Sequence, residues 1–194
     1  MAAAKQFART ATVVLEPRKL WPSGIPGRKG RIVGCEEGRA LAFADDPGWI
    51  DELRLLALGD APIDSVVADG LVAVLSRWRN QWPARPVAVV PIPSRRHPMR
   101  VASIAEHIAR IGKLPLLDAL VATGVAPPTD TASGARVTAL AAGLTLRGDI
   151  EIPCGPVLLV DDTYRSGWTM TIAAALLRSA GATAVLPLVV HQLP

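Results

Sequence analysis

The spacing of hydrophobic and polar positions changes from one segment of the chain to the next. Apolar residues recur three or four positions apart in some segments, which predicts amphipathic helices, and form short continuous runs in others, which predicts buried strands. The helical pattern covers residues 47–58, 63–78, 101–111, 135–142 and 168–180. The strand pattern covers residues 12–15, 87–92, 114–122, 156–160 and 184–190.

Local signals mark two helix ends. Asp46 is followed by Pro47, a pair typical of an N-cap and a first helical position. Gly181 follows the last apolar helical segment, as is typical of a residue that ends a helix. We therefore expect one helix to begin at Pro47 and another to end near Ala180.

The order of these elements predicts the fold class. Apolar strands that alternate with helices are typical of α/β proteins, and continuous apolar strands are typical of parallel sheets with both faces covered. We expect residues 45–194 to form an α/β domain with a mostly parallel sheet flanked by helices. Residues 1–44 contain several Pro and Gly turns, and we expect them to form a small irregular arm or hood.

Composition narrows the class of protein. A chain of 194 residues corresponds to one domain at roughly 150 residues per domain. Half of its residues are hydrophobic, which excludes a disordered chain, yet no uninterrupted apolar run reaches the ~18 residues of a membrane span. The N-terminus has no apolar secretory segment, so we expect a cytoplasmic protein. Cys35 and Cys154 lack the spacing of a zinc site or a disulfide framework.

The positive charge is concentrated in one part of the chain. Residues 1–40 contain eight Lys and Arg against three Glu, a net +5, whereas residues 41–194 contain thirteen against fourteen acids, a net −1. Trp21 follows Arg18 and Lys19, a combination that suits single-stranded DNA through phosphate contacts and base stacking. The alternative is a solvated arm in which Trp21 packs against the core.

One segment carries most of the chemical information. The apolar run that begins at Val157 leads into Asp161 and Asp162, then into a turn with Gly167, then into a helix. Ligands of open α/β sheets bind where strands end, and N–H groups at a helix start attract anions. Two carboxylates beside such a site suit the hydroxyls of a sugar and attract Mg²⁺. The segment predicts a ribose 5-phosphate pocket; the alternative is an ordinary turn with a capping Asp.

This segment resembles the phosphoribosyl pyrophosphate motif of type I phosphoribosyltransferases, in which an apolar strand precedes two acids and a small loop that ends in Gly-x-Thr. The resemblance implies that Asp161 and Asp162 are the catalytic acids that bind ribose and Mg²⁺. It also implies a 5-phosphate loop, formed by Arg165, Ser166, Gly167, Trp168 and Thr169. The chain departs from the motif at Arg165, where Thr or Asp is frequent, and at Trp168, where a small residue is common.

A second strand end supports the first. The run from Val89 to Pro93 leads into Ser94, Arg95 and Arg96, a basic turn suited to pyrophosphate, as the corresponding loop is in the family. The alternative is an exposed Arg-rich strand end. His97 is expected to be an ordinary loop residue. Residues 123–134, followed by Arg136, lie where the family often has a mobile lid.

Short motifs along the chain also resemble a narrower group, the phosphoribosyltransferase-like C-terminal domain of some actinobacterial RecQ-type ATP-dependent DNA helicases. They are Glu16 to Pro22, Gly38 to Leu41, Gly48-Trp49, the Pro93 to Arg96 turn, Gly112 to Pro115, the Asp161-Asp162 loop and Ala184 to Leu188. No GxxxxGK[ST] motif occurs, so the chain is not itself a helicase motor. The resemblance implies an excised domain or a free-standing relative, with a helicase as partner or parent chain.

Three functions remain open on the sequence alone. The first is Mg²⁺-dependent transfer of a phosphoribosyl group from phosphoribosyl pyrophosphate to a nitrogen nucleophile. The second is a non-catalytic module that binds a phosphorylated ribose or a nucleic acid for a helicase in DNA repair. The third is a scaffold whose pocket has lost its affinity for phosphate and ribose.

Overall fold

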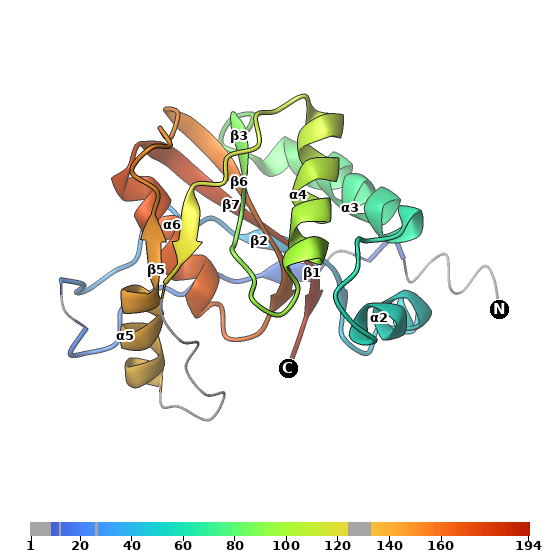
Figure 1. The fold of residues 1–194 in the computed structure, drawn as a ribbon, viewed down its shortest axis with the longest axis horizontal. Coiled ribbons are helices and arrows are strands. Elements are labelled where there is room, and N and C mark those ends of the chain that lie inside the picture. The colour runs from blue at the N-terminus through green and yellow to red at the C-terminus, as the bar shows by residue number, and fades with distance from the viewer. Residues whose placement is uncertain (1–8, 12, 26, 124–132) are drawn as a thin grey trace.

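A five-stranded sheet forms the centre of the computed structural model, which describes residues 9–11, 13–25, 27–123 and 133–194 (Figure 1). The strand order is β1-β2-β7-β6-β3. The strands are β1 (Val13–Leu15), β2 (Gly38–Phe43), β3 (Ala88–Pro91), β6 (Gly155–Tyr164) and β7 (Ala182–Gln192). Strand β1 is antiparallel to β2, and the other pairs are parallel. The predicted mostly parallel sheet is therefore confirmed.

Helices cover both faces of this sheet. One face packs against α2 (Ile50–Ala57), α3 (Ser65–Trp78) and α4 (Pro98–Gly112), and the short 3-10 helix η1 (Arg79–Gln81) follows α3. The other face packs against α6 (Trp168–Ser179), α5 (Ser133–Gly143) and a small sheet of β4 (Leu120–Ala122) and β5 (Leu144–Leu146). None of the helices in the described ranges is long and apolar enough to cross a bilayer.

Most predicted helices form where the apolar spacing placed them. Asp64 caps α3, since its carboxylate accepts a hydrogen bond of 2.8 Å from the backbone N–H of Val67. Helix α4 begins three residues earlier than expected, at Pro98, because proline is tolerated in the first turn, where an N–H has no helical partner. Helix α6 ends at Ser179, and Gly181 follows with a left-handed φ of 124°.

The first predicted helix and the strand predicted over residues 114–122 have different bounds in the structure. The first helix begins at Ile50 rather than Pro47, because Asp46 accepts a 2.7 Å hydrogen bond from the N–H of Gly48 and so caps a preceding turn. The strand expected over residues 114–122 is confined to Leu120–Ala122, which pairs antiparallel with β5 outside the main sheet. Before it, Leu116 makes a single bridge to Val89, because Pro115 offers its carbonyl but has no N–H.

The segment predicted to be irregular supplies two strands of the main sheet. Strand β2, which the apolar pattern did not reveal, pairs in parallel with β7, and β1 pairs with β2. Arg39 interrupts the apolar pattern of β2, because a charged residue is expected at the surface. In the structure Arg39 is buried, with its guanidinium 5.3 Å from the ring centre of Trp78. We use the name hood for residues 16–25 and 27–37, a folded-back segment in which the backbone N–H of Trp21 donates to the carbonyl of Gly30 at 3.0 Å.

Candidate active site

The carboxyl ends of β3, β6 and β7 lie at the same edge of the sheet, where a cavity of about 520 Å³ opens. Ligands of open α/β sheets bind at this edge. The polar wall consists of Ser94, Arg95, Arg96, His97, Arg100, Asp161, Asp162, Thr163, Arg165, Thr169 and His191. Helices α2 and α5 add an apolar wall. A second cavity, of about 580 Å³, is lined by the C-terminal parts of α3 and α4 and contains none of the predicted site residues.

The two predicted acids lie on opposite faces of the sheet. Strand β6 extends to Tyr164, four residues beyond its predicted end, so Asp161 and Asp162 belong to the strand rather than to a loop. Successive side chains of a strand point to opposite faces. Both acids line the cavity, but Asp161 shares the face of α6, whereas Asp162 shares the face of α4 and is only 4% exposed. The two carboxylates therefore have different environments.

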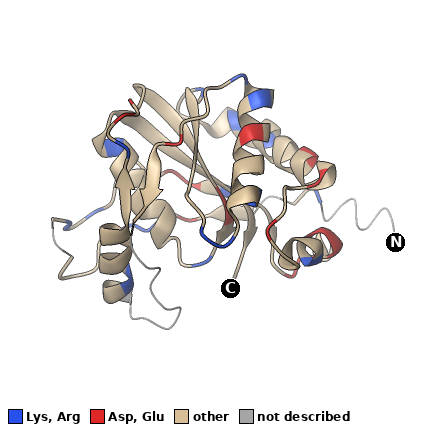
Figure 2. Ribbon diagram, viewed as in Figure 1, with Lys and Arg blue, Asp and Glu red and all other residues tan. Residues whose placement is uncertain are grey.

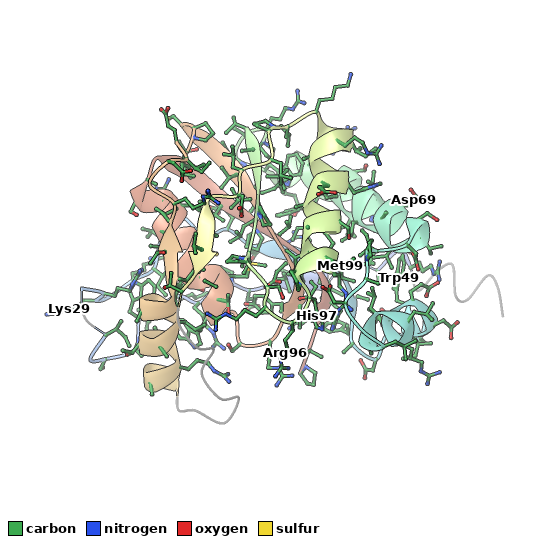
Figure 3. All side chains as sticks on the ribbon, viewed as in Figure 1. Lys29, Trp49, Asp69, Arg96, His97 and Met99 are labelled. Atoms are coloured by element: carbon green, nitrogen blue, oxygen red, sulfur yellow. The ribbon has the colours of Figure 1, made fainter. Side chains whose placement is uncertain are left out.

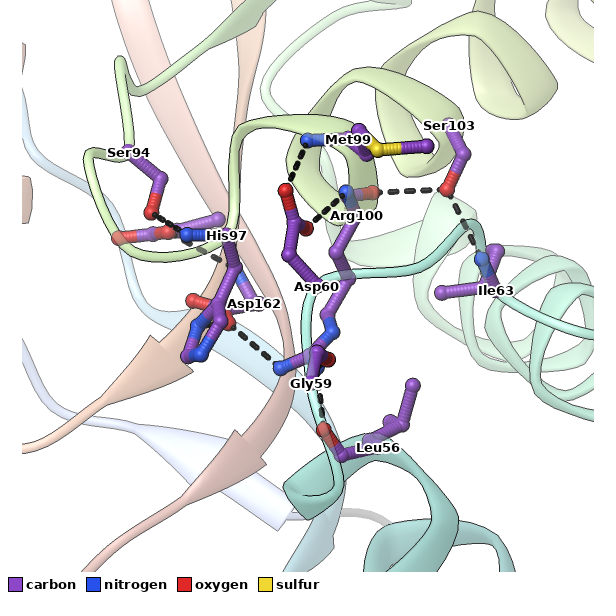
Figure 4. Close-up of polar contacts among 11 residues, drawn as sticks. Leu56, Gly59, Asp60, Ile63, Ser94, His97, Met99, Arg100, Ser103 and Asp162 are labelled. Carbon is purple, nitrogen blue, oxygen red and sulfur yellow. Dashed lines mark hydrogen bonds and ion pairs between the residues drawn. The ribbon is translucent and has the colours of Figure 1, made fainter.

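Asp162 is held in a buried ionic network (Figure 4). Its Oδ2 atom accepts hydrogen bonds from Arg100 Nη1 at 3.1 Å and from His97 Nδ1 at 2.6 Å. Arg100, itself 2% exposed, also donates to the backbone carbonyls of Leu56 and Gly59. Sequence reasoning missed Arg100, although one signal was present: it lies four positions before Ile104, on the apolar face of α4.

Asp161 is in a setting that disfavours its charge. Burial raises the pKa of Asp161 well above the usual range, and the neighbouring charge of Asp162 raises it further. The backbone N–H of Asp162 donates to Asp161 Oδ1 at 2.8 Å, which offsets part of this effect. A ligand that donates hydrogen bonds or carries positive charge would therefore favour the ionised form.

Asp161→Asn should make the unliganded protein more stable at neutral pH. A carboxyl whose folded-state pKa is raised loses stability as the pH rises from about 3.9, the unfolded value, through the folded value. Asn has nearly the same side-chain volume as Asp but does not ionise, so the variant does not lose this stability as the pH rises. Thermal unfolding followed by circular dichroism should give a higher Tm at pH 7, with the difference shrinking toward pH 4. Asp69→Asn, at an exposed position of α3, is the control. A lower Tm for Asp161→Asn at pH 7 would contradict the expectation.

The turn after β6 leads directly into α6. Gly167 has a φ of +75°, a left-handed conformation that favours glycine, and a side chain there would overlap the hydroxyl of Tyr164. Its carbonyl accepts from both the N–H and the hydroxyl of Thr171, each at 2.9 Å. The first N–H groups of α6 are therefore positioned at the edge of the sheet, where Arg165 and Thr169 line the cavity.

Trp168 packs beneath the hood instead of lining the cavity. Its buried ring stacks on Trp21 at a centroid distance of 6.2 Å, and Arg18 lies 5.4 Å from its centre. Arg28 lies 4.8 Å from the centre of Trp21. The ring of Trp21 thus contacts side chains of the protein itself. This agrees with the alternative in which Trp21 packs against the core instead of stacking on a DNA base. Trp168 can offer a ligand only its backbone N–H.

Two hydrogen bonds fasten the hood to the same turn. Arg18 Nε donates to the carbonyl of Ser166 at 2.7 Å, and the hydroxyl of Tyr164 donates to the carbonyl of Glu16 at 2.6 Å. Burial also raises the pKa of the Tyr164 hydroxyl, which therefore remains a hydrogen-bond donor at neutral pH. The hood accordingly supports the predicted phosphate loop from the side away from the cavity.

The basic loop after β3 lines the same cavity. Figure 2 shows its basic positions in blue, and Figure 3 labels Arg96 and His97, at the lower end of α4. Arg95 and Arg96 are exposed, and Arg95 Nη2 lies 3.4 Å from the carbonyl oxygen of Ala122. The hydroxyl of Ser94 accepts a 3.0 Å hydrogen bond from the N–H of His97. Of the expected lid, residues 124–132 lie outside the described residues, and α5, with Arg136, follows them.

Two histidines complete the polar wall, and neither was assigned a role from the sequence. His97 precedes α4 and contacts Asp162, so it is more than the expected loop residue. His191, near the end of β7, has a buried Nδ1 with no hydrogen-bond partner among the described residues, and burial lowers the pKa of His191. Only the parallel pairing of β7 with β6 brings His191 beside Thr163, a relation that no local motif reveals.

The side chains at this cavity could hold Mg²⁺ only through one or two protein ligands. Within the described ranges, no three or more His, Cys, Asp and Glu side chains are grouped so as to hold a metal ion. Mg²⁺ commonly binds through one or two carboxylates and completes its shell with water and substrate phosphates. Asp161, which lines the cavity, meets this requirement, whereas Asp162 is already engaged by Arg100 and His97.

Comparisons with known proteins give structural similarity only. No family model matches the sequence, and no curated protein matches it significantly. Adenine phosphoribosyltransferase from Leishmania tarentolae is 16% identical over 98% of this chain and 73% of its own, with a TM-score of 0.44. Orotate phosphoribosyltransferase from Aeropyrum pernix is 21% identical over 97% of this chain and 80% of its own, with a TM-score of 0.40. An allosteric regulatory enzyme of purine biosynthesis is 23% identical over 57% of this chain, with a TM-score of 0.38, and the chain spans 23% of its length.

Proposed function

We propose that the cavity at the carboxyl edge binds phosphoribosyl pyrophosphate and that the protein transfers its phosphoribosyl group to a nitrogen nucleophile. One observation carries this proposal: Asp161, the two ends of the following turn (Arg165 and Thr169) and the Arg95-Arg96 loop all line a single cavity. They supply a hydroxyl acceptor, an anion cradle and a cationic cluster. These are the three recognition elements that a phosphorylated ribose with a pyrophosphate group requires.

Each part of the wall has a defined task in the proposed reaction. Backbone N–H groups at the start of α6 and the hydroxyl of Thr169 hold the 5-phosphate, while Asp161 accepts hydrogen bonds from ribose hydroxyls. Arg95 and Arg96 stabilise the negative charge that develops on pyrophosphate as it leaves C1. Mg²⁺, when bound beside Asp161 and the phosphates, supplies further charge neutralisation.

The two acids are proposed to act differently. Asp161 performs the ribose-binding and metal-binding tasks that the family motif implies for both acids, because Asp162 is already engaged by Arg100 and His97. Asp162 contributes through Arg100 and His97, which it contacts through Oδ2. In the phosphate loop, Ser166 and Trp168 act through the backbone, since the ring of Trp168 lies under the hood.

A non-catalytic module with the same cavity would have the same affinity but would release no pyrophosphate. Measuring pyrophosphate release therefore separates the enzyme from the binding module, and a lack of affinity identifies the scaffold.

The helicase partner or parent chain, the DNA contact and the cytoplasmic location stay predictions from the sequence.

Asp161→Asn should weaken binding of both phosphoribosyl pyrophosphate and ribose 5-phosphate. Hydrogen bonds to a charged group contribute about 1.5–3 kcal/mol, so we expect a loss of about 10-fold to 150-fold in affinity. Isothermal titration calorimetry with and without Mg²⁺ measures it, and an unchanged circular dichroism spectrum shows that the fold is intact. Asp69→Asn is the control. Undiminished affinity of Asp161→Asn for both ligands would refute the site assignment.

A further inference from the structure

His97 and Asp162 form an Asp-His pair whose free end lies in the cavity. The carboxylate of Asp162, paired with Arg100, can only accept hydrogen bonds, so the 2.6 Å contact places a proton on His97 Nδ1. In the neutral ring, Nε2 is then the proton acceptor. The side chain of His97 is 33% exposed and lines the cavity, whereas that of Asp162 is 6% exposed. The basic nitrogen is therefore the one available to a ligand.

Three elements hold this ring in position. The backbone N–H of His97 donates to Ser94, and His97 is the residue from which α4 begins. Asp60, in the connection after α2, accepts the N–H groups of Met99 and Arg100, each at 3.0 Å, and so anchors the first turn of α4 (Figure 4). A base that is held by packing and hydrogen bonds needs little reorganisation during a reaction.

Charged and titratable groups from several elements surround the ring or line the same cavity. They are Asp161 and Asp162 on β6, Arg165 after β6, Arg100 on α4, His191 on β7, Arg95 and Arg96 on the same loop, and Asp60 after α2. Arg100 compensates the charge of Asp162. Burial favours the neutral form of His191, which therefore adds no positive charge beside His97 at neutral pH.

We propose that His97 is the general base of the reaction, that Asp162 and Arg100 are its positioning residues, and that the substrate is a nucleophile with an N–H to lose. This rests on the proposed function. As the C1–oxygen bond to pyrophosphate breaks, its electron pair leaves with pyrophosphate. The lone pair of the nucleophile forms the new bond to C1, and the proton of the nucleophile passes to His97 Nε2. Asp162 continues to accept the hydrogen bond from Nδ1 and so stabilises the imidazolium.

The main test compares His97→Asn with the wild type. Asn keeps a donor near the position of Nδ1 and removes Nε2, so phosphoribosyl pyrophosphate affinity by calorimetry should stay within about threefold. The rate of pyrophosphate release, with ammonia or hydroxylamine as the nucleophile, should fall by about 10²-fold to 10⁴-fold. His107→Asn, on α4 but not at this cavity, is the matched control.

Further measurements make every outcome decisive. In His97→Gly, added imidazole should restore turnover, which a merely structural role would not allow. An active wild type that releases pyrophosphate no faster than His97→Asn would overturn the general base. If the wild type does not bind phosphoribosyl pyrophosphate, or binds it without releasing pyrophosphate, the proposed function fails, and nitrogen NMR of the imidazole then tests the pair alone. A proton on Nδ1 that shifts in Asp162→Asn supports the pair, whereas a proton on Nε2 overturns it.

Discussion

Arg100→Met should destabilise the protein by about 3–5 kcal/mol, the usual cost of removing one partner of a buried ion pair. Arg100 and Asp162 are 2% and 4% exposed, so water cannot replace the lost guanidinium. The substitution also leaves the carbonyls of Leu56 and Gly59 without their donor. Equilibrium unfolding in urea at pH 7 measures the loss.

A double variant separates charge from packing. Arg100→Met with Asp162→Asn has no uncompensated carboxylate, so it should be more stable than Arg100→Met alone. Arg147→Met is the matched control, because Arg147 forms ion pairs with Asp118 and Asp149 at the surface and should cause a much smaller change. Equal losses for Arg100→Met and Arg147→Met would show that the buried network does not stabilise the fold.

The sheet was predictable where burial on both faces leaves a continuous apolar run. Strands β3, β6 and β7 have such runs, and their parallel order follows from the helices between them. Strand β2 also lies inside the sheet, between β1 and β7, but it begins with Gly38 and Arg39. A buried arginine that packs on Trp78 looks like a surface residue in the sequence, so the strand was missed.

The candidate site was predictable as a place but not as a set of contacts. The motif pointed to Asp161, Arg165 and Thr169, which line the cavity at the carboxyl edge. The partners of Asp162 are His97 and Arg100, which are 65 and 62 positions away in the chain. No spacing rule connects residues so far apart. The alternation of β6 separates the two acids, and this became visible only because the strand continues to Tyr164.

The charge pattern of the N-terminal segment had a structural cause that the sequence did not show. Arg18 and Arg28 lie against the rings of Trp168 and Trp21, so part of the net positive charge serves contacts within the protein. An arginine over an aromatic ring adds attraction at a partly buried site. The hood therefore uses its basic residues to hold the turn that presents Gly167.

Replacing Arg95 and Arg96 together by Ala should weaken phosphoribosyl pyrophosphate binding far more than ribose 5-phosphate binding. Both side chains lie on the loop after β3, across the cavity from the start of α6, where the 5-phosphate is expected. Two charge-assisted hydrogen bonds at about 1.5–3 kcal/mol each correspond to a loss of about 10²-fold to 10⁴-fold. Ribose 5-phosphate has no pyrophosphate group, so its affinity should change only a few-fold.

The specificity of this loss is what identifies the pyrophosphate site. Arg77→Ala with Arg79→Ala removes the same amount of charge from exposed positions near the end of α3, outside this cavity, and controls for long-range attraction. Calorimetry with inorganic pyrophosphate alone gives an independent measure, since the Arg95 and Arg96 variant should lose this ligand while the control retains it. Equal losses for phosphoribosyl pyrophosphate and ribose 5-phosphate would mean that the loop attracts phosphate in general, and the leaving-group role would then have to lie with other residues of the wall.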